Sequence, residues 1–308
     1  MRNQRSVATA FLTLSILAGV FLTLDLAAGP SDLAKGFVSP PQSAKPWVYW
    51  FWLDGNITRE GITADLEAMR RVGIGGVLIM EVDQGAPKGP ARFAGPQWRE
   101  LFKFMLAEAN RLGLEVNMNN DAGWCGSGGP WITPALAMQK VVWTTTPVEG
   151  PRRFEQVLPE PDKVAGYYED IAVLAFATPA EYRIEGIQAK AAFIRQEVEF
   201  KKLPEPLPAD KTIPRGSIRE LTAQMSKDGR LVWDVPPGKW SVVRFGHTPT
   251  GKDNHPAPLD GRGLECDKLS RKAADVMFEG LMGKLIADSR TLDIVSIVPC
   301  DFMVLSGF

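Results

Sequence analysis

The chain has 308 residues, enough for one large domain or two ordinary ones, and 45% of them are hydrophobic, so a sizeable core can form. Its 35 lysines and arginines nearly balance its 36 aspartates and glutamates, giving a formal net charge of −1. With no run of like charge, this balance excludes a general nucleic-acid-binding surface. Three cysteines form no disulfide framework, although Cys125 could pair with Cys266, and two histidines form no zinc cluster.

The N-terminal segment has the pattern of an export signal. Arg2 and Arg5 precede the apolar run 7–24, and Leu26-Ala27-Ala28 follows it. We expect residues 1–28 to be a signal peptide and the rest of the chain to be periplasmic or extracellular. The apolar run is long for a signal and the cleavage motif is imperfect, so an uncleaved membrane anchor is the alternative.

The next part alternates between strand-like and helix-like patterns. It predicts strands at 47–53, 74–80 and 114–118 and helices at 58–72 and 97–112, with Gly73 and Gly113 as helix stops. Each strand is a continuous apolar run, which indicates burial on both faces. We therefore expect a parallel sheet covered by helices, with 47–53 and 76–80 as neighbouring strands.

From about Val141 the helical pattern fades. Short apolar runs at 171–176, 192–200 and 240–245 are separated by proline-rich turns. The segment Trp233–Trp240 contains two prolines and is predicted to be an edge hairpin, where proline is tolerated. We expect residues 141–247 to form an inserted β-rich module of β-sandwich type.

Helical pattern returns at 268–288, an apolar strand is predicted at 292–298, and 299–308 form an atypical tail. Residues 30–140 and 248–298 would then form one α/β unit. The expected fold class is α/β, with a partial (β/α)8 barrel interrupted by the inserted module.

Three successive predicted strands end in polar residues. The strand at 114–118 runs into Asn119, Asn120 and Asp121, followed by a glycine-rich loop with Trp124 and Trp131. Small polar groups hydrogen-bond sugar hydroxyls, and indole faces stack on sugar C–H groups. The sequence therefore suggests a sugar site, and the alternative is an ordinary turn capped by Asn and Asp beside two core tryptophans.

Asp54, and then Glu81 and Asp83, end the two preceding strands. The carboxyl ends of parallel strands meet at one edge, so we expect all these groups to share one solvent-facing cleft. Glu265, before the last long helix, is a further candidate, with a first-turn helix acid as its alternative. The candidate catalytic residues are Glu81, Asp83, Asp121 and Glu265, and the candidate substrate-binding residues are Trp52, Asp54, Asn119, Asn120, Trp124 and His255.

Four blocks carry a resemblance to a known family. They are YWFWLDGNIT (49–58), GIGGVLIMEVD (73–83), NNDAGWCGSGGPW (119–131) and GRGLECDKLS (261–270). In this order, over residues 37–288, they resemble the N-terminal half of glycoside hydrolase family 106. The resemblance implies a catalytic (β/α)8 barrel with β-sandwich modules and an α-L-rhamnosidase that inverts with two carboxylates. It also implies a Ca²⁺ ion near the rhamnose hydroxyls.

The chain departs from the family pattern at its end. The stretch DIVSIVP (293–299) lacks the glutamate of the acidic strand expected there, and only about four barrel-type strands can be counted, against eight in a barrel. We therefore expect a truncated enzyme, inactive alone unless a companion chain supplies the missing strands. Its partner would be a rhamnose-containing glycan. The alternatives are an inactive carbohydrate-binding remnant and a membrane-anchored envelope interaction protein.

Overall fold

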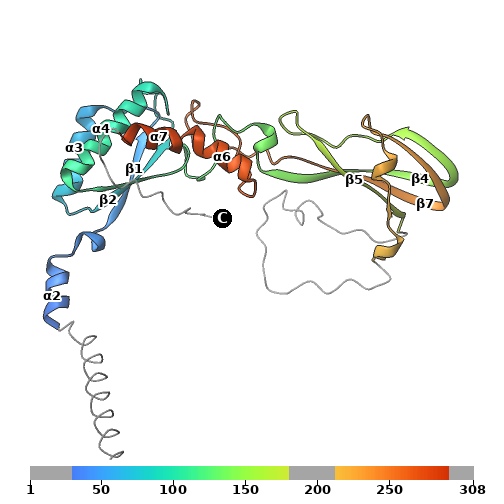
Figure 1. The fold of residues 1–308 in the computed structure, drawn as a ribbon, viewed down its shortest axis with the longest axis horizontal. Coiled ribbons are helices and arrows are strands. Elements are labelled where there is room, and N and C mark those ends of the chain that lie inside the picture. The colour runs from blue at the N-terminus through green and yellow to red at the C-terminus, as the bar shows by residue number, and fades with distance from the viewer. Residues whose placement is uncertain (1–29, 180–211, 291–308) are drawn as a thin grey trace, which may run out of the picture. The chain divides into compact units, whose positions relative to one another are not determined.

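The computed structural model describes residues 30–179 and 212–290 (Figure 1). Its helices are α2 (Pro30–Val38), α3 (Arg59–Arg71), α4 (Pro96–Leu112), α6 (Arg271–Gly280) and α7 (Met282–Ser289). Its strands are β1 (Trp47–Leu53), β2 (Gly76–Val82), β3 (Glu115–Met118), β4 (Gln139–Val157), β5 (Glu169–Ala177), β6 (Arg219–Glu220) and β7 (Arg230–Pro249).

Several predictions fall outside the described residues: the signal peptide 1–28, the strands 192–200 and 292–298, and the tail 299–308. Export and anchoring stay predictions. Within the described ranges, no helix combines the length and the apolar content that a membrane crossing requires.

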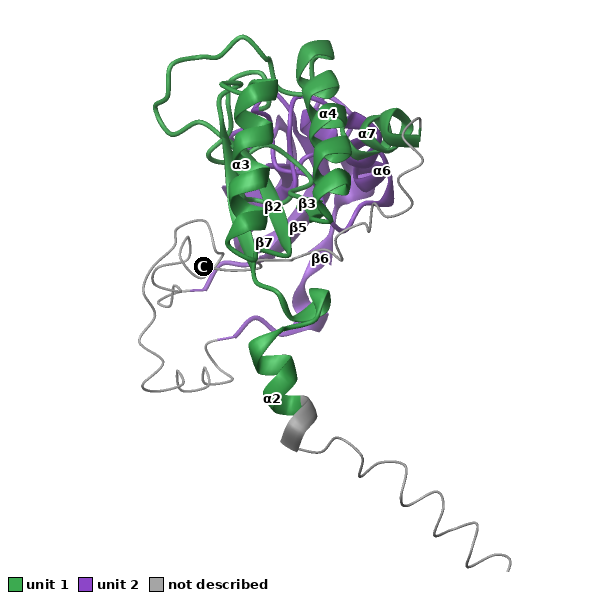
Figure 2. Cartoon of the chain, turned by 90° about the vertical axis from the view of Figure 1, so that its left-hand side faces the viewer, with its two compact units in different colours: residues 1–126, 255–261, 281–308 green, residues 127–254, 262–280 purple. Residues whose placement is uncertain are grey.

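The chain divides into two compact units (Figure 2). Unit 1 takes residues 1–126, 255–261 and 281–308, and unit 2 takes 127–254 and 262–280. The short segment 255–261 thus returns to unit 1 from a region otherwise belonging to unit 2. The domain boundaries expected from the sequence stay a prediction.

Unit 1 contains a parallel sheet of order β1-β2-β3. Trp47 pairs with Gly76 and Leu53 with Val82, so the predicted parallel pairing of the first two strands is confirmed. Helices α3 and α4 lie on one face of the sheet (Figure 2). The α/β class is therefore confirmed. Three strands do not show a barrel, which stays a prediction.

The two faces of β1 differ in burial. Trp50 and Trp52 point to the helix-covered face and are 7% and 2% exposed, whereas Trp47, Tyr49 and Phe51 are 40–60% exposed. The expectation of burial on both faces holds for β2, but it is wrong for β1 among the described residues. The continuous apolar run could not distinguish these cases, because both faces of β1 carry large apolar side chains.

The helix ends follow local capping chemistry. The Thr58 hydroxyl accepts a hydrogen bond from Gly61 N at 3.1 Å and begins α3. Gly113 ends α4 at φ +65°, and Leu114 N donates to Ala109 O at 2.9 Å. This left-handed cap is the one that glycine supplies at low cost. The predicted helices 58–72 and 97–112 are thus confirmed within one residue at each end.

Unit 2 contains an antiparallel sheet of order β4-β7-β5-β6. Its core includes Phe154, Leu231 and Trp233. The hairpin predicted at 233–240 is wrong, because β7 runs straight through this segment. The two prolines of this segment, Pro236 and Pro237, lie opposite the point in β4, between Gly150 and Arg152, where the β4–β7 register shifts. They therefore interrupt no regular ladder.

The predicted helix 268–288 is two helices. Leu281 adopts φ −130° and ψ −70° between α6 and α7, which breaks the helical hydrogen bonding. Gly280 ends α6 against the indole of Trp131; a Cβ there would lie 2.4 Å from the ring. Close packing of the chain on this ring accompanies the break, and the periodicity of the sequence carried no sign of it.

Candidate functional site

The ends of β1, β2 and β3 meet at one edge of the unit 1 sheet. Asp54 N donates to Val82 O, and Asn119 N donates to Ile79 O, each at 3.0 Å. The parallel ladder therefore continues one residue beyond β1 and β3. The polar residues that follow each strand are held at the same edge, as the sequence predicted.

Glu81 lies inside this edge, with only 1% of its surface exposed. Oε1 accepts a hydrogen bond from Gly55 N at 2.9 Å, and Oε2 accepts one from the Trp98 indole N–H at 3.0 Å. Burial raises the pKa of Glu81 to about 7, although the Trp98 and Gly55 hydrogen bonds act in the opposite direction.

Asp121 is also buried, at 0% exposure, and it shapes the glycine-rich loop. Its Oδ1 accepts hydrogen bonds from Asn119 Nδ2 at 3.0 Å and from Gly126 N at 3.1 Å. Asn119 Nδ2 also donates to Gly123 O at 2.7 Å. The expectation that all the strand-end carboxylates face solvent is therefore wrong for Glu81 and Asp121. Their catalytic roles stay predictions.

We call five exposed or half-buried residues at this edge the rim: Asp54, Asp83, Asn120, Trp124 and His255. Asn119 is half-buried too, but its amide is committed to Asp121 and Gly123. Trp124 is 43% exposed, and its backbone N–H donates to His255 O at 3.3 Å. The rings of the two residues meet edge to face, with their centres 6.5 Å apart. The 255–261 segment thus supplies His255 to the rim, 131 positions along the chain from Trp124.

The pKa of Asp54 is raised, first by burial and then by the nearby charge of Asp83, while Lys88 lowers it. Lys88 Nζ lies 2.9 Å from Asp260, whose other oxygen accepts from Arg92 at 2.8 Å. These two contacts hold the pKa of Asp260 below its usual range. The sequence did not single out Lys88, Arg92 or Asp260, since 168 positions separate Arg92 from Asp260.

The 84–95 loop packs on the turn after β1. Gly89 N donates to Asp54 O at 2.7 Å, and Asn56 Nδ2 donates to Pro87 O at 2.6 Å. Gly55 has φ +74°, and a Cβ there would lie 2.2 Å from Ala91 O. Glycine is therefore required at this position both for its backbone conformation and for the close approach of the loop.

Trp52 lies in a buried aromatic cluster rather than on the rim. Its ring meets Trp98 at 5.4 Å and Phe102 at 6.4 Å, both edge to face. Its indole Nε1 is buried and has no hydrogen-bond partner among the described residues. A substrate-binding role for Trp52 stays a prediction.

Glu265 belongs to unit 2, whereas the other candidates belong to unit 1. It is half-buried, and its Oε1 accepts from Lys268 Nζ at 2.7 Å. Its backbone binds Lys252 and Met138. These three hydrogen-bond partners of Glu265 all belong to unit 2. The catalytic role of Glu265 stays a prediction.

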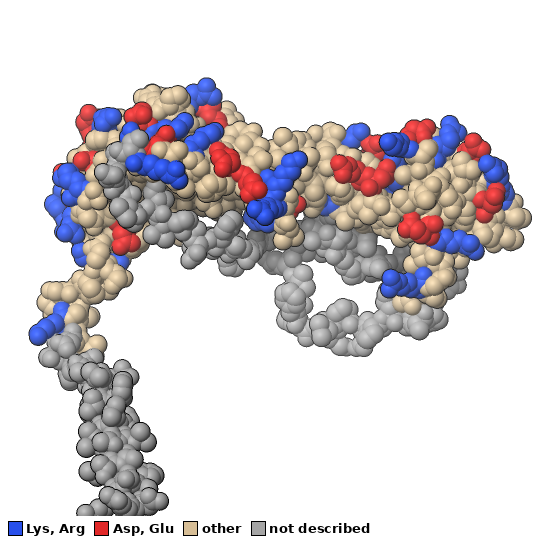
Figure 3. Space-filling model, viewed as in Figure 1, with Lys and Arg blue, Asp and Glu red and all other residues tan. Residues whose placement is uncertain are grey.

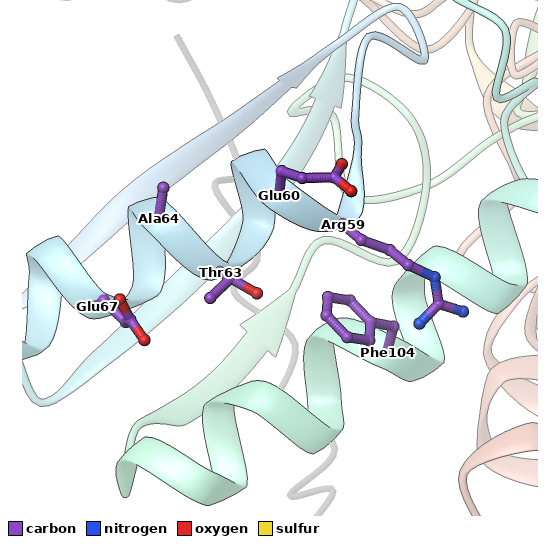
Figure 4. Close-up of a pocket in the computed structure, with 6 residues that line it drawn as sticks. All are labelled: Arg59, Glu60, Thr63, Ala64, Glu67 and Phe104. Carbon is purple, nitrogen blue, oxygen red and sulfur yellow. The ribbon is translucent and has the colours of Figure 1, made fainter.

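A pocket of about 430 Å³ adjoins Asp260 and includes Arg92, Phe93 and Gln97. A second pocket, of about 370 Å³, lies between α3 and α4 (Figure 4). In the second pocket the Arg59 guanidinium lies 4.5 Å from the Phe104 ring centre, and Glu67 binds Arg111. Acidic and basic side chains are interspersed over these helices (Figure 3). Contacts within unit 1 account for Arg59, Thr63 and Glu67 in this second pocket.

The resemblance to the family implies a Ca²⁺ ion, which would need side chains able to hold it. The part of the chain that the structure describes contains no group of three or more His, Cys, Asp or Glu side chains that could hold a metal ion. Hard cations need several oxygen ligands, so this donor set does not fit a Ca²⁺ site made of these side chains. Calcium binding stays a prediction.

Comparison with known proteins identifies the family. The model of glycoside hydrolase family 106, described as alpha-L-rhamnosidase, matches residues 38–185 and 175–293. The chain belongs to glycoside hydrolase family 106. The resemblance expected from the four sequence blocks is confirmed.

The relatives of this family 106 chain are longer. A protein of Formosa agariphila named "Putative beta-glucuronidase" is 43% identical over 276 residues, covering 87% of this chain and 24% of that protein. The solved structure of a rhamnosidase from Novosphingobium sp. PP1Y matches with a TM-score of 0.65 and 24% identity. It covers 83% of this chain, which spans 38% of that chain. This likeness shows a shared fold.

Proposed function

We propose that the rim is a sugar-binding surface of a glycoside hydrolase that removes terminal α-L-rhamnosyl residues from glycans. The observation that carries the proposal is an exposed indole, Trp124, that lies at the same carboxyl edge of a parallel sheet as two carboxylates and an amide. The indole offers an apolar face for the sugar ring, and the oxygens of Asp54, Asp83 and Asn120 accept from hydroxyls.

The charge of the rim favours a neutral deoxy sugar over a uronide. Asp54 and Asp83 are close enough to repel, as the raised pKa of Asp54 indicates. In the described part of unit 1, Lys88 acts on Asp54, and it shares Asp260 with Arg92. A uronate carboxylate would meet the two like charges of Asp54 and Asp83. Against them stands one net positive charge on the cluster of Lys88, Arg92 and Asp260, so binding of the uronate costs energy. We therefore favour the specificity of the family description over that in the name of the Formosa relative.

Hydrolysis with inversion requires two carboxyl groups in opposed roles, roughly 6.5–9.5 Å apart. Asp83 is the more exposed of the two carboxylates at the end of β2 and is the better candidate for contact with substrate. Glu265, which belongs to unit 2, is a separate candidate suggested by its place before the last long helix in the sequence. An aryl α-L-rhamnoside assay of Asp83→Asn and of Glu265→Gln tests each residue by itself.

A second candidate function is carbohydrate binding without hydrolysis. It is favoured by the burial of Glu81 and Asp121, because both oxygens of Glu81 and Oδ1 of Asp121 already accept hydrogen bonds from the protein. Binding of methyl α-L-rhamnoside without turnover of the aryl rhamnoside would support this candidate, and turnover by the purified chain would exclude it.

The sugar-binding test uses a matched pair of tryptophans. Trp124 and Trp47 are both 43% exposed, but Trp47 lies at the opposite end of β1. We expect Trp124→Ala to weaken binding of methyl α-L-rhamnoside by about fivefold, since an aromatic contact is worth about 1 kcal/mol. Trp47→Ala should leave the affinity unchanged. Equal affinities of the two variants, or tighter binding of methyl β-D-glucuronide than of the rhamnoside, would contradict the proposal.

A further inference from the structure

Glu81 joins three separate segments at the strand-end edge. Its side chain accepts from the turn after β1 through Gly55 N and from helix α4 through the Trp98 indole. Its own carbonyl accepts from Gly123 N at 2.7 Å. One residue at the end of β2 therefore fixes the segment on each side of it and the helix above it.

The segments that Glu81 holds carry the rim. Asp54 directly precedes Gly55, and Trp124 directly follows Gly123. The 84–95 loop leans on the same turn, because Ala91 N donates to Gly55 O at 3.3 Å. A displacement of Gly55 would thus move a rim carboxylate and the loop that covers the turn.

We infer that Glu81 is a positioning residue of the sugar site, which orients Asp54 and Trp124 without touching the substrate. The inference rests on the proposed function for its consequence in sugar binding. With 1% of its surface exposed and both oxygens committed to donors, Glu81 has no open approach for a sugar. The positioning role of Glu81 differs from the catalytic role that its place at the end of a strand predicted.

The chemistry of the two donors specifies an ionised carboxylate. Such a group accepts at both oxygens, and its hydrogen bonds are stronger than neutral ones. The protonated acid keeps one full acceptor, and so does glutamine, whose amide N–H₂ would oppose the second donor. The ionised form that orders the rim is also the form whose burial is costly, which is a common compromise at functional sites.

This compromise gives the site a pH signature. Burial raises the pKa of Glu81 to about 7, with Asp54 on the β1 turn adding to the rise. The groups that face it from α4 and from that turn are the Trp98 indole and the Gly55 amide. Above about pH 7 both bonds are charge-assisted, and below it one of them weakens.

The test compares Glu81→Gln with Glu115→Gln by NMR of the full chain between pH 5.5 and 8.5. Glu115 is an exposed residue of β3 in the same sheet, so it is a matched control. As the pH rises through about 7, we expect the proton chemical shifts of the Gly55 amide and the Trp98 indole to move downfield in the wild type and in Glu115→Gln. This change should be absent from Glu81→Gln. The Trp124 amide should shift between the two variants at pH 8.5.

Titration with methyl α-L-rhamnoside then measures the effect of each substitution on sugar affinity. At pH 8.5 we expect Glu81→Gln to bind about tenfold more weakly than Glu115→Gln, a difference that narrows at pH 5.5, where the wild type is itself protonated. Equal affinities at pH 8.5, or a perturbation that stops at Gly55 and Trp98 and does not reach Trp124, would overturn the inference. If the wild type binds no sugar, the proposed function fails. The chemical-shift changes caused by Glu81→Gln then still test the positioning role, by whether they extend to the Trp124 amide. If Glu81→Gln does not fold, the pH titration of the wild type is used instead: a chemical-shift change near pH 7 at both the Trp98 indole and the Trp124 amide supports the inference, and a change at Trp98 alone overturns it.

Discussion

Replacing Gly55 by alanine tests whether the 84–95 loop is seated on the turn that carries Asp54. The matched control is Gly113→Ala at the end of α4, because both glycines have positive φ, +74° and +65°. They differ in their surroundings: a Cβ at Gly55 would lie 2.2 Å from Ala91 O, and a Cβ at Gly113 would meet nothing within 4 Å.

The expected magnitudes follow from this difference. Gly113→Ala incurs the left-handed conformation alone, which costs about 1–2 kcal/mol of unfolding free energy. Gly55→Ala incurs the same cost and an overlap with a backbone oxygen that cannot rotate away. Overpacking typically adds about 1–3 kcal/mol, so the total loss is about 2–5 kcal/mol.

The assay is native-state hydrogen exchange of the buried β2 amides in low urea, which reports the opening of unit 1 alone. We expect Gly55→Ala to lose more stability than Gly113→Ala and to weaken the protection of Gly89, whose N–H binds Asp54 O. Equal losses in the two variants, with Gly89 still protected, would refute the close approach of the loop to the turn.

Two further predictions concern the buried groups of each unit. Burial raises the pKa of Glu81 from 4.5 to about 7, so the protonated side chain is favoured in the folded state. Its contribution to the free energy of unfolding is fully present below pH 4.5 and is lost as the pH rises through 7. The loss is about 3 kcal/mol, at about 1.36 kcal/mol per pKa unit. Urea unfolding of the wild type should show this decline, Glu81→Gln should lack it, and parallel pH profiles would contradict it. In unit 2, Gly280→Ala should lower stability by about 1–3 kcal/mol, because its Cβ would meet the Trp131 ring at 2.4 Å; Gly216→Ala, which meets nothing within 4 Å, is the control, and equal urea midpoints would exclude the contact.

Much of unit 1 could be predicted from the sequence because its signals are local. Continuous apolar runs predicted β1 and β2, and glycine after an amphipathic helix predicted the end of α4 at Gly113. The hairpin at 233–240 was wrong because proline in a strand has two outcomes, an edge or a bulge. Only the pairing of β7 with β4 decides between them.

The candidate residues lie at the strand-end edge that the sequence predicted, but two of the carboxylates, Glu81 and Asp121, are buried rather than facing solvent. The alternation of a strand does not tell whether a polar residue at its end faces water. Glu81 is turned inward because α4 supplies an indole N–H, 17 positions along the chain. The ion pairs of Asp260 with Lys88 and Arg92 depend on the 255–261 segment returning to unit 1, which no local pattern predicts.

The central claim is that the rim binds a neutral rhamnosyl group, and a map of amide shifts tests it most directly. Titration of the wild type with methyl α-L-rhamnoside should move the amides of Asp54, Asn120 and Trp124 and leave the β4 and β7 amides of unit 2 in place. Methyl β-D-glucuronide should move the same rim amides less, or not at all. Shifts confined to unit 2, no shifts at a saturating concentration, or tighter binding of the glucuronide would contradict the account.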